Sequence, residues 1–100
     1  VMITENGAAF DDEITNGRLH DQARIHFLRD HIEAMAEAVT AGADVRAYFV
    51  WSLMDNFEWA HGYSKRFGIV HVDYASQERT WKDSAHWHRD LVARWKDRRL

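Results

Sequence analysis

The chain has 100 residues, of which 29% are charged and 46% are hydrophobic, and its formal net charge at pH 7 is −3. This length fits about one small domain, and a charge so near neutrality gives no reason to expect a nucleic acid or an anionic membrane as partner. No apolar run approaches the roughly 18 residues of a membrane-spanning helix, and the absence of cysteine excludes disulfides and thiolate metal sites.

The first predicted element is a short buried strand at the start of the chain. Residues 1–4 are apolar or β-branched, and the turn-forming residues Glu5, Asn6 and Gly7 end the run. Glu5 is therefore expected at the carboxyl end of a strand. Because the run begins as if a strand were already under way, we expect the true N-terminus to lie upstream. Residues 8–20 show no period and are predicted to form a polar loop.

A long amphipathic helix is predicted over residues 21–41. Apolar side chains recur at steps of three and four residues, which places them on one face: Ile25, Leu28, Ile32, Met35 or Ala36, and Val39. Charged side chains between them are expected to face water: Arg24, Arg29, Glu33 and Glu37. Asp21 suits the N-cap position, and Gly42 stands where a left-handed residue commonly ends a helix.

A second buried strand is predicted over residues 45–50, a run that is mostly apolar and aromatic. Strand, helix and strand then make a βαβ unit, whose two strands should be parallel. Glu5 and Trp51 are therefore expected at the same edge of the sheet. In parallel sheets and barrels, that carboxyl edge is where ligands bind.

The rest of the chain is predicted to contain a loop, a hairpin and a last helix. Residues 60–68 carry two glycines and read as a long loop, after which residues 69–72 and 78–81 should pair as a short hairpin. The last helix, at about 83–97, presents apolar side chains at four-residue steps: Trp87, Leu91 and Trp95. Two βα units cannot cover a parallel sheet on both faces. We therefore expect either the last part of a larger barrel or doubly wound sheet, or an oligomer that completes one.

The segment between the second strand and the loop, Trp51 to Trp59, is unusually rich in rings and acids. It reads W-S-L-M-D-N-F-E-W, with two indoles, a phenyl ring and two carboxylates. Aromatic faces beside carboxylates suit a sugar, because the sugar ring stacks while the acids accept hydroxyl hydrogen bonds. Asp55 and Asn56 are expected to shape the loop rather than to touch a ligand. Glu58, between two rings, needs a partner if it is buried.

Several motifs, in this order and at these intervals, resemble the C-terminal part of glycoside hydrolase family 1, the retaining β-glucosidases and their relatives. They are I-T-E-N-G at 3–7, W-S-L-M-D-N-F-E-W at 51–59, G-Y at 62–63, R-F-G at 66–68 and V-D at 72–73. The resemblance implies an α/β fold, in which residues 1–100 form the C-terminal quarter of a single (β/α)8 TIM-barrel domain. That quarter comprises strand 7, helix 7, strand 8 and helix 8, which are not a complete fold alone.

The same resemblance implies roles for particular residues. Glu5 matches the catalytic nucleophile, whereas the motif N-E-P, which carries the family's acid/base, does not occur in this chain. Trp51 matches the stacking platform beneath the sugar. Glu58 matches a ligand of the sugar hydroxyls O4 and O6, Trp59 a ligand of O3, and Phe67 an aromatic wall of the same subsite.

The function expected from this resemblance is retaining hydrolysis of β-glycosidic bonds in a full-length protein, with the 100 residues inactive alone. The substrate would be a β-glucoside or oligosaccharide, and the remainder of the barrel would be the partner. No cofactor or metal is expected, because the spacing of the His residues suits no shared helix face. The alternative is a stand-alone, non-catalytic sugar-binding module. The compartment is open, with the cytoplasm slightly favoured by the lack of cysteine.

Overall fold

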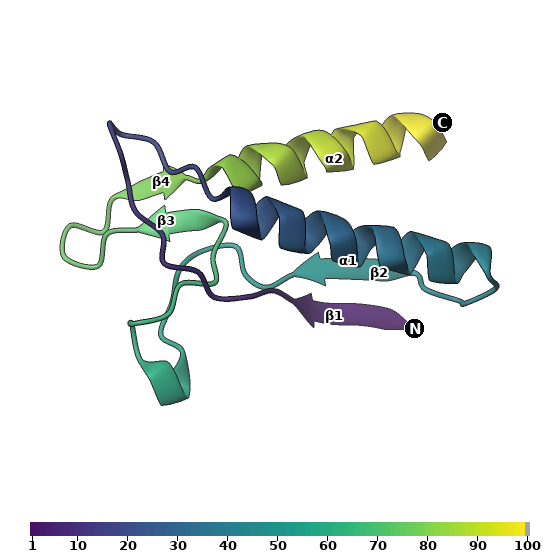
Figure 1. The fold of residues 1–100 in the computed structure, drawn as a ribbon, viewed down its shortest axis with the longest axis horizontal. Coiled ribbons are helices and arrows are strands. Elements are labelled where there is room, and N and C mark those ends of the chain that lie inside the picture. Colours follow the sequence, from purple (N-terminus) through teal and green to yellow (C-terminus); the bar gives the residue numbers. More distant parts are fainter. Residues whose placement is uncertain (100) are drawn as a thin grey trace.

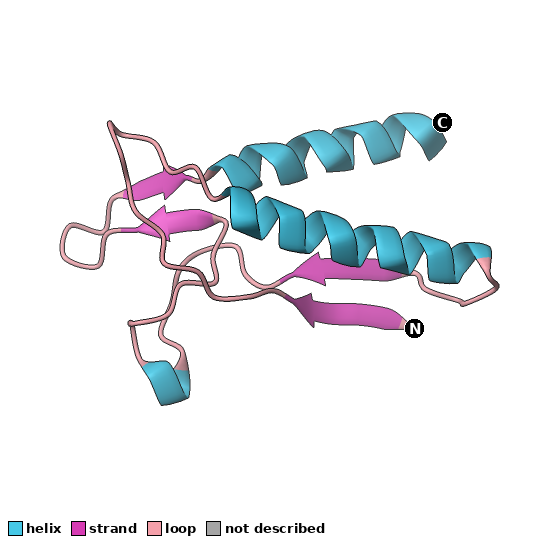
Figure 2. Ribbon diagram, in the orientation of Figure 1, coloured by secondary structure: helices cyan, strands magenta, loops and turns pink. Residues whose placement is uncertain are grey.

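The computed structural model describes residues 1–99; Leu100, the last residue of the predicted domain 1–100, lies outside the described residues. In chain order, the elements are β1 (Met2–Asn6), α1 (Gln22–Thr40), β2 (Ala47–Val50), the 3-10 helix η1 (Trp59–His61), β3 (Val70–Val72), β4 (Arg79–Trp81) and α2 (Asp83–Arg99). The strands β1 and β2 run toward the loops and η1, and both helices run back in the opposite direction (Figures 1 and 2). No helix among the described residues is long and apolar enough to cross a membrane.

The strands β1 and β2 pair in parallel, as the βαβ pattern predicts, with Met2 opposite Ala47 and Asn6 opposite Val50. The prediction that these strands are buried is wrong for this chain, since Phe49 is 55% exposed and Met2 lies largely in solvent. Two strands and two helices provide too little surface to cover a parallel sheet on both faces. No closed barrel forms among residues 1–99.

The helix α1 begins and ends within one residue of its predicted bounds, and its apolar face is buried near the N-terminus, at Ile25 and Leu28. Arg24 was predicted to face water, and that prediction is wrong, because the residue is 1% exposed. Periodicity placed Arg24 between apolar positions but could not reveal that carboxylates from other segments surround it. Asp21 precedes the helix as expected but makes no capping bond, because its carboxylate turns to Arg24 and Ser84.

A small core joins the two helices to the hairpin. It consists of Leu28, Ile69, Val70 and Ala85, with Phe27, Val50 and Trp87 packed against it. The predicted hairpin is confirmed as the antiparallel pair β3–β4, with Val70 opposite Trp81. Trp87 packs against the core as expected, whereas Trp95, farther along α2, is largely exposed. The core therefore lies at the loop end of the helices, next to the segments that carry the candidate site.

Candidate functional site

The carboxyl ends of β1 and β2 lie side by side (Figure 1). Glu5, near the end of β1, and Trp51, directly after β2, are therefore at the same end of the parallel pair, as predicted from topology. The backbone N–H of Trp51 donates a hydrogen bond of 2.8 Å to the carbonyl of Asn6, the residue that follows Glu5. The Tyr48 hydroxyl also donates to the Asn6 side-chain oxygen, at 2.5 Å, and burial raises the pKa of this tyrosine. The Glu5 side chain itself is exposed. The Glu5 carboxylate is thus exposed to solvent at the end of β1, and two hydrogen bonds hold this strand end to the end of β2.

Gly7 allows the two strand ends to approach this closely. A Cβ atom at this position would lie 1.8 Å from the carbonyl oxygen of Trp51, far inside van der Waals contact. A side chain here would therefore push the backbone of Trp51 away from that of Gly7. The close contact with Trp51 thus requires a glycine at position 7, whether or not this residue forms a turn.

We expect Gly7→Ala to displace Trp51 and to destabilise the protein by about 1–3 kcal/mol, the usual cost of forcing an extra methyl group into a packed site. Thermal unfolding and the near-ultraviolet circular dichroism of the tryptophans would measure the two effects. Ala38→Ser, which adds one atom on the exposed surface of α1, is the matched control and should cost about 0.5 kcal/mol or less. An unchanged melting temperature in Gly7→Ala would contradict the steric argument.

The loop between Trp51 and Gly68 is closed at its base by backbone hydrogen bonds. The Ser52 N–H donates to the Phe67 carbonyl at 3.1 Å, and the Ile69 N–H donates to the Ser52 carbonyl at 3.0 Å. Three residues after Ser52, the Asp55 N–H donates to the Val70 carbonyl at 3.0 Å. We call this paired region, residues 52–55 with 67–70, the neck of the loop. It places the backbone of Phe67 directly beside the residue that follows Trp51.

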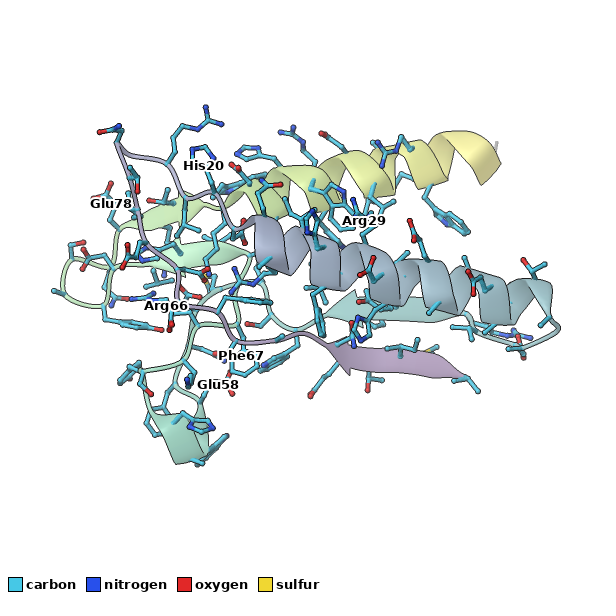
Figure 3. The ribbon with its side chains drawn as sticks, in the orientation of Figure 1. His20, Arg29, Glu58, Arg66, Phe67 and Glu78 are labelled. Carbon is cyan, nitrogen blue, oxygen red and sulfur yellow. The ribbon has the colours of Figure 1, made fainter. Side chains whose placement is uncertain are left out.

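Trp51 and Glu58 are in direct contact. The indole Nε1–H of Trp51 donates a hydrogen bond of 3.2 Å to Glu58 Oε1. Glu58 is half-buried, and its backbone N–H donates to the carbonyl of Gly62 at 2.7 Å, which joins the two ends of η1. In Figure 3, Glu58 and Phe67 are drawn on the side of the molecule where η1 projects. Glu58 was expected to need a partner if buried; it is only half-buried, and the indole is a hydrogen-bond partner.

Trp59 is exposed to solvent. Its side chain is 88% exposed, and the ring contact described for it is with Phe57, edge to face, with centroids 6.0 Å apart. The structure therefore brings Trp51 and Glu58 together through side chains, and joins Glu5 and Phe67 to Trp51 through neighbouring backbone. Trp59 presents its indole to solvent from η1.

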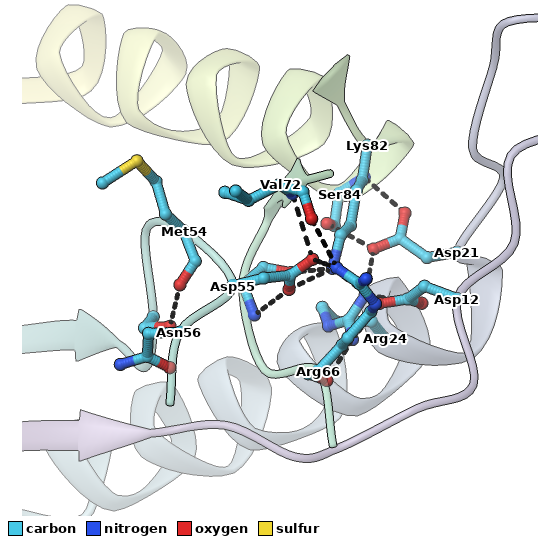
Figure 4. A network of polar contacts seen from close by, with 12 residues as sticks. Asp12, Asp21, Arg24, Met54, Asp55, Asn56, Arg66, Val72, Lys82 and Ser84 are labelled. Carbon is cyan, nitrogen blue, oxygen red and sulfur yellow. Dashed lines mark hydrogen bonds and ion pairs between the residues drawn. The ribbon is translucent and has the colours of Figure 1, made fainter. Parts of the chain in front are cut away.

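Asp55 belongs to the scaffold of the loop, as the sequence predicted. Its Oδ1 accepts hydrogen bonds from the Gly68 N–H at 3.1 Å and from Lys82 at 2.9 Å, and its Oδ2 accepts from Arg66 at 2.5 Å and from the Val72 N–H at 3.3 Å (Figure 4). Burial raises the pKa of Asp55, but the bonds and charges of Lys82 and Arg66 outweigh it and leave the pKa below its ordinary value. The carboxylate is therefore ionised and fully bonded at neutral pH.

Sequence reasoning missed the network that surrounds Asp55. Three carboxylates (Asp12, Asp21, Asp55) alternate with three cations (Arg24, Arg66, Lys82) across the loop before α1, the start of α1, the neck and the start of α2. Arg24 bridges Asp12 and Asp21, and Lys82 bridges Asp12 and Asp55 (Figure 4). Asp21 and Arg24 are only three residues apart, but the other paired residues stand 11 to 70 residues apart, so no local pattern indicates the network.

The comparisons with known proteins agree on one family. The model of glycosyl hydrolase family 1 matches residues 1–97. The chain is 58% identical over 93 residues to "Beta-glucosidase A" of Thermotoga maritima, and 54% identical over 98 residues to a bifunctional beta-D-glucosidase/beta-D-fucosidase of Bifidobacterium breve. These matches cover 92% and 93% of this chain but 21% of each relative.

A solved structure gives the same result. The structure of the family 1 β-glucosidase from Thermotoga maritima in complex with isofagomine lactam superposes with a TM-score of 0.91 at 57% identity, covering 92% of this chain and 21% of that one. The chain thus spans about a fifth of the length of the relatives that it matches. Over the covered residues, the fold of this chain agrees closely with that of the solved structure.

Proposed function

The chain belongs to glycosyl hydrolase family 1, and on this premise we propose that it supplies the nucleophile and the glycone-binding residues of an enzyme that hydrolyses β-glucosides with retention. The observation that carries the proposal is the meeting of Glu5 and Trp51 at one sheet edge, with Trp51 bonded to Glu58. The activity named for the relatives, β-glucosidase, supports the reaction class. Their greater length supports a longer protein, in which this chain would be the last two βα units of a barrel.

Glu5 is the proposed nucleophile. Its carboxylate would attack the anomeric carbon as the bond to the leaving-group oxygen breaks, which forms a covalent glycosyl-enzyme. A second carboxyl group about 5 Å away would protonate the leaving group and then deprotonate the water that releases the sugar. That second group would come from outside this chain, since no N-E-P motif occurs within it. The exposed position of Glu5 at the end of β1 leaves its carboxylate accessible to a sugar.

The wall that recognises the sugar would be built from Trp51, Glu58, Trp59 and Phe67. The bond from the Trp51 indole uses one of about four acceptor positions of the Glu58 carboxylate, so the others can accept the O4 and O6 hydroxyls. The indole of Trp59 is exposed and available to O3, and the backbone of Phe67 is fixed next to Ser52 by the neck. A site with such polar partners discriminates strongly against sugars whose hydroxyls point elsewhere.

The function is tested by comparing the isolated 100 residues with the full-length protein, by which we mean the longer protein proposed to contain them. We expect the full-length protein to hydrolyse 4-nitrophenyl β-D-glucoside, and the isolated chain to hydrolyse nothing because half of the catalytic pair is absent. The isolated chain with Glu5→Ala, purified in parallel, controls for contaminating enzymes. Hydrolysis by the isolated chain above that control would refute the need for a second carboxylate from elsewhere, and a full-length protein inactive on aryl glycosides would refute the function.

Glu58→Gln should weaken sugar recognition while preserving the shape of the loop. Losing charge-assisted hydrogen bonds worth about 1.5–3 kcal/mol lowers kcat/KM for the glucoside by about 10- to 200-fold. The loss should be smaller for the 6-deoxyglucoside, which lacks one of the hydroxyls concerned. Glu78→Gln, at an exposed position in the turn between β3 and β4 (Figure 3), is the matched control and should leave both substrates unaffected. Equal losses on both substrates would contradict a contact to O6.

A further inference from the structure

Lys82 is a fully buried cation, and among the described residues its hydrogen bonds and ion pairs involve none of the proposed sugar-binding residues. It lies between β4 and α2 and is 0% exposed. Its ammonium group has three protons and finds three acceptors: Asp12 Oδ2 at 2.5 Å, Asp55 Oδ1 at 2.9 Å and the carbonyl of Gly68 at 2.6 Å (Figure 4). Two of these acceptors, Asp55 and Gly68, lie on the two opposite sides of the neck. Lys82 therefore fastens the neck to the loop that precedes α1.

The neck cannot shift without breaking these bonds. While Lys82 holds one oxygen of Asp55, Arg66 and the Val72 N–H hold the other. At Gly68, a Cβ atom would lie 2.3 Å from the Asp55 nitrogen, so the two sides of the neck are in direct backbone contact. A buried ammonium with two carboxylates is costly to move, because any displaced partner becomes an unpaired buried charge.

The proposed sugar-binding residues lie next to both sides of the neck that Lys82 joins. Trp51 precedes Ser52 at the start of the neck, Phe67 directly precedes Gly68, and Glu58 lies three residues beyond Asp55. The hydrogen bond between Trp51 and Glu58 spans the same loop at 3.2 Å. Hydroxyl recognition requires donors and acceptors to be placed to a fraction of an ångström, and misplacement by about 1 Å can cost about 100-fold in rate.

We propose that Lys82 is a positioning residue for sugar recognition. It acts through Asp55 to hold Trp51, Glu58 and Phe67 in the relative positions that sugar binding requires. The proposal rests on the function proposed above. Lys82 touches neither the substrate nor the reacting atoms, so its effect falls on the choice between sugars more than on the nucleophile.

The test compares Lys82→Met with the wild type in the full-length protein. The measured quantity is the preference for 4-nitrophenyl β-D-glucoside over its 6-deoxy analogue, as a ratio of kcat/KM values. We expect this ratio to fall by about 10- to 100-fold, with KM raised more than kcat is lowered. Lys96→Met, the same change at an exposed position of α2, should leave the ratio at its wild-type value. A folded Lys82→Met variant with lower stability and a wild-type ratio would show a merely structural role and overturn the proposal.

Asp55→Asn takes the place of Lys82→Met if the latter does not fold. It keeps an oxygen for the Gly68 N–H and for Lys82, but it removes the charge and places an amide NH2 group where Oδ2 accepts from Arg66 and the Val72 N–H. The same fall in preference is expected, and a wild-type ratio in the folded variant would overturn the proposal.

Amide hydrogen exchange provides a readout that is independent of activity. Residues 56–65 should exchange faster in either variant, with the middle of α1 unchanged, and unchanged exchange in the loop would count against the positioning role. A wild-type protein inactive on all glycosides would refute the proposed function, while the exchange measurement would still report whether Lys82 orders the loop.

Discussion

Glu5→Ala is expected to reduce hydrolysis of an aryl β-glucoside by the full-length protein by at least about 10⁴-fold. Without the carboxylate of the proposed nucleophile no glycosyl-enzyme can form, because no group at that position would bond to the anomeric carbon. The Glu5 side chain is exposed at the end of β1, so its removal should leave the parallel pairing with β2 intact. Initial rates with 4-nitrophenyl β-D-glucoside would measure the loss. Glu13→Ala, at an exposed position of the following loop, should retain wild-type rates.

Azide provides the stricter test of the nucleophile. In Glu5→Ala a small anion can enter the space that the carboxylate leaves and attack the anomeric carbon from the same side. One displacement then replaces two, and the product should be the α-glucosyl azide, with inverted configuration. Product analysis by nuclear magnetic resonance distinguishes the two anomers. Rescue that yields no α-glucosyl azide, or full activity without azide, would rule out Glu5 as the nucleophile.

The sequence predicted the elements well because each has a local signal. The period of α1 and the apolar runs of β1 and β2 lie within short windows, and two parallel strands joined by a helix follow from them. The turn predicted at Glu5, Asn6 and Gly7 is wrong, because β1 continues through Asn6. Burial was predicted less well. Phe49 and Val39 are exposed although their patterns indicate a core. Such patterns report what a residue packs against in the complete fold, and this chain provides about a fifth of the length of its relatives.

Some features of the candidate site could be predicted from the sequence and others could not. The shared edge of Glu5 and Trp51 follows from topology, and the scaffold role of Asp55 follows from the chemistry of loop carboxylates. The bond between Trp51 and Glu58 depends on how the intervening loop turns, which no period encodes. The contacts of Lys82 could not be predicted from the sequence either, because its partners lie in two irregular segments far away in sequence.

Arg24→Met should destabilise the full-length protein by about 3–5 kcal/mol, the usual cost of breaking a buried ion pair from one side. The Arg24 guanidinium donates to both oxygens of Asp12, at 3.1 and 2.8 Å, to Asp21 at 2.6 Å and to the carbonyl of Arg66 at 3.0 Å. Both carboxylates are almost completely buried, so removing the cation leaves their charges short of compensation in a poorly solvated place. Chemical denaturation of the wild type and the variant would measure the difference.

The matched control is Arg29→Met, on the same helix and with the same change of side chain. Arg29 is 48% exposed, and its nearest carboxylate, Asp30, is 3.9 Å away, so the expected cost is within about 0.5 kcal/mol. Helical periodicity assigns both arginines to the solvent face, and the structure separates them only by what surrounds each one. Adding Asp21→Asn to Arg24→Met should recover part of the lost stability, because Arg24 is the cation that pairs with Asp21, whereas Asp12 keeps its ion pair with Lys82. Equal costs for Arg24→Met and Arg29→Met would mean that the buried network contributes nothing beyond an exposed helix position.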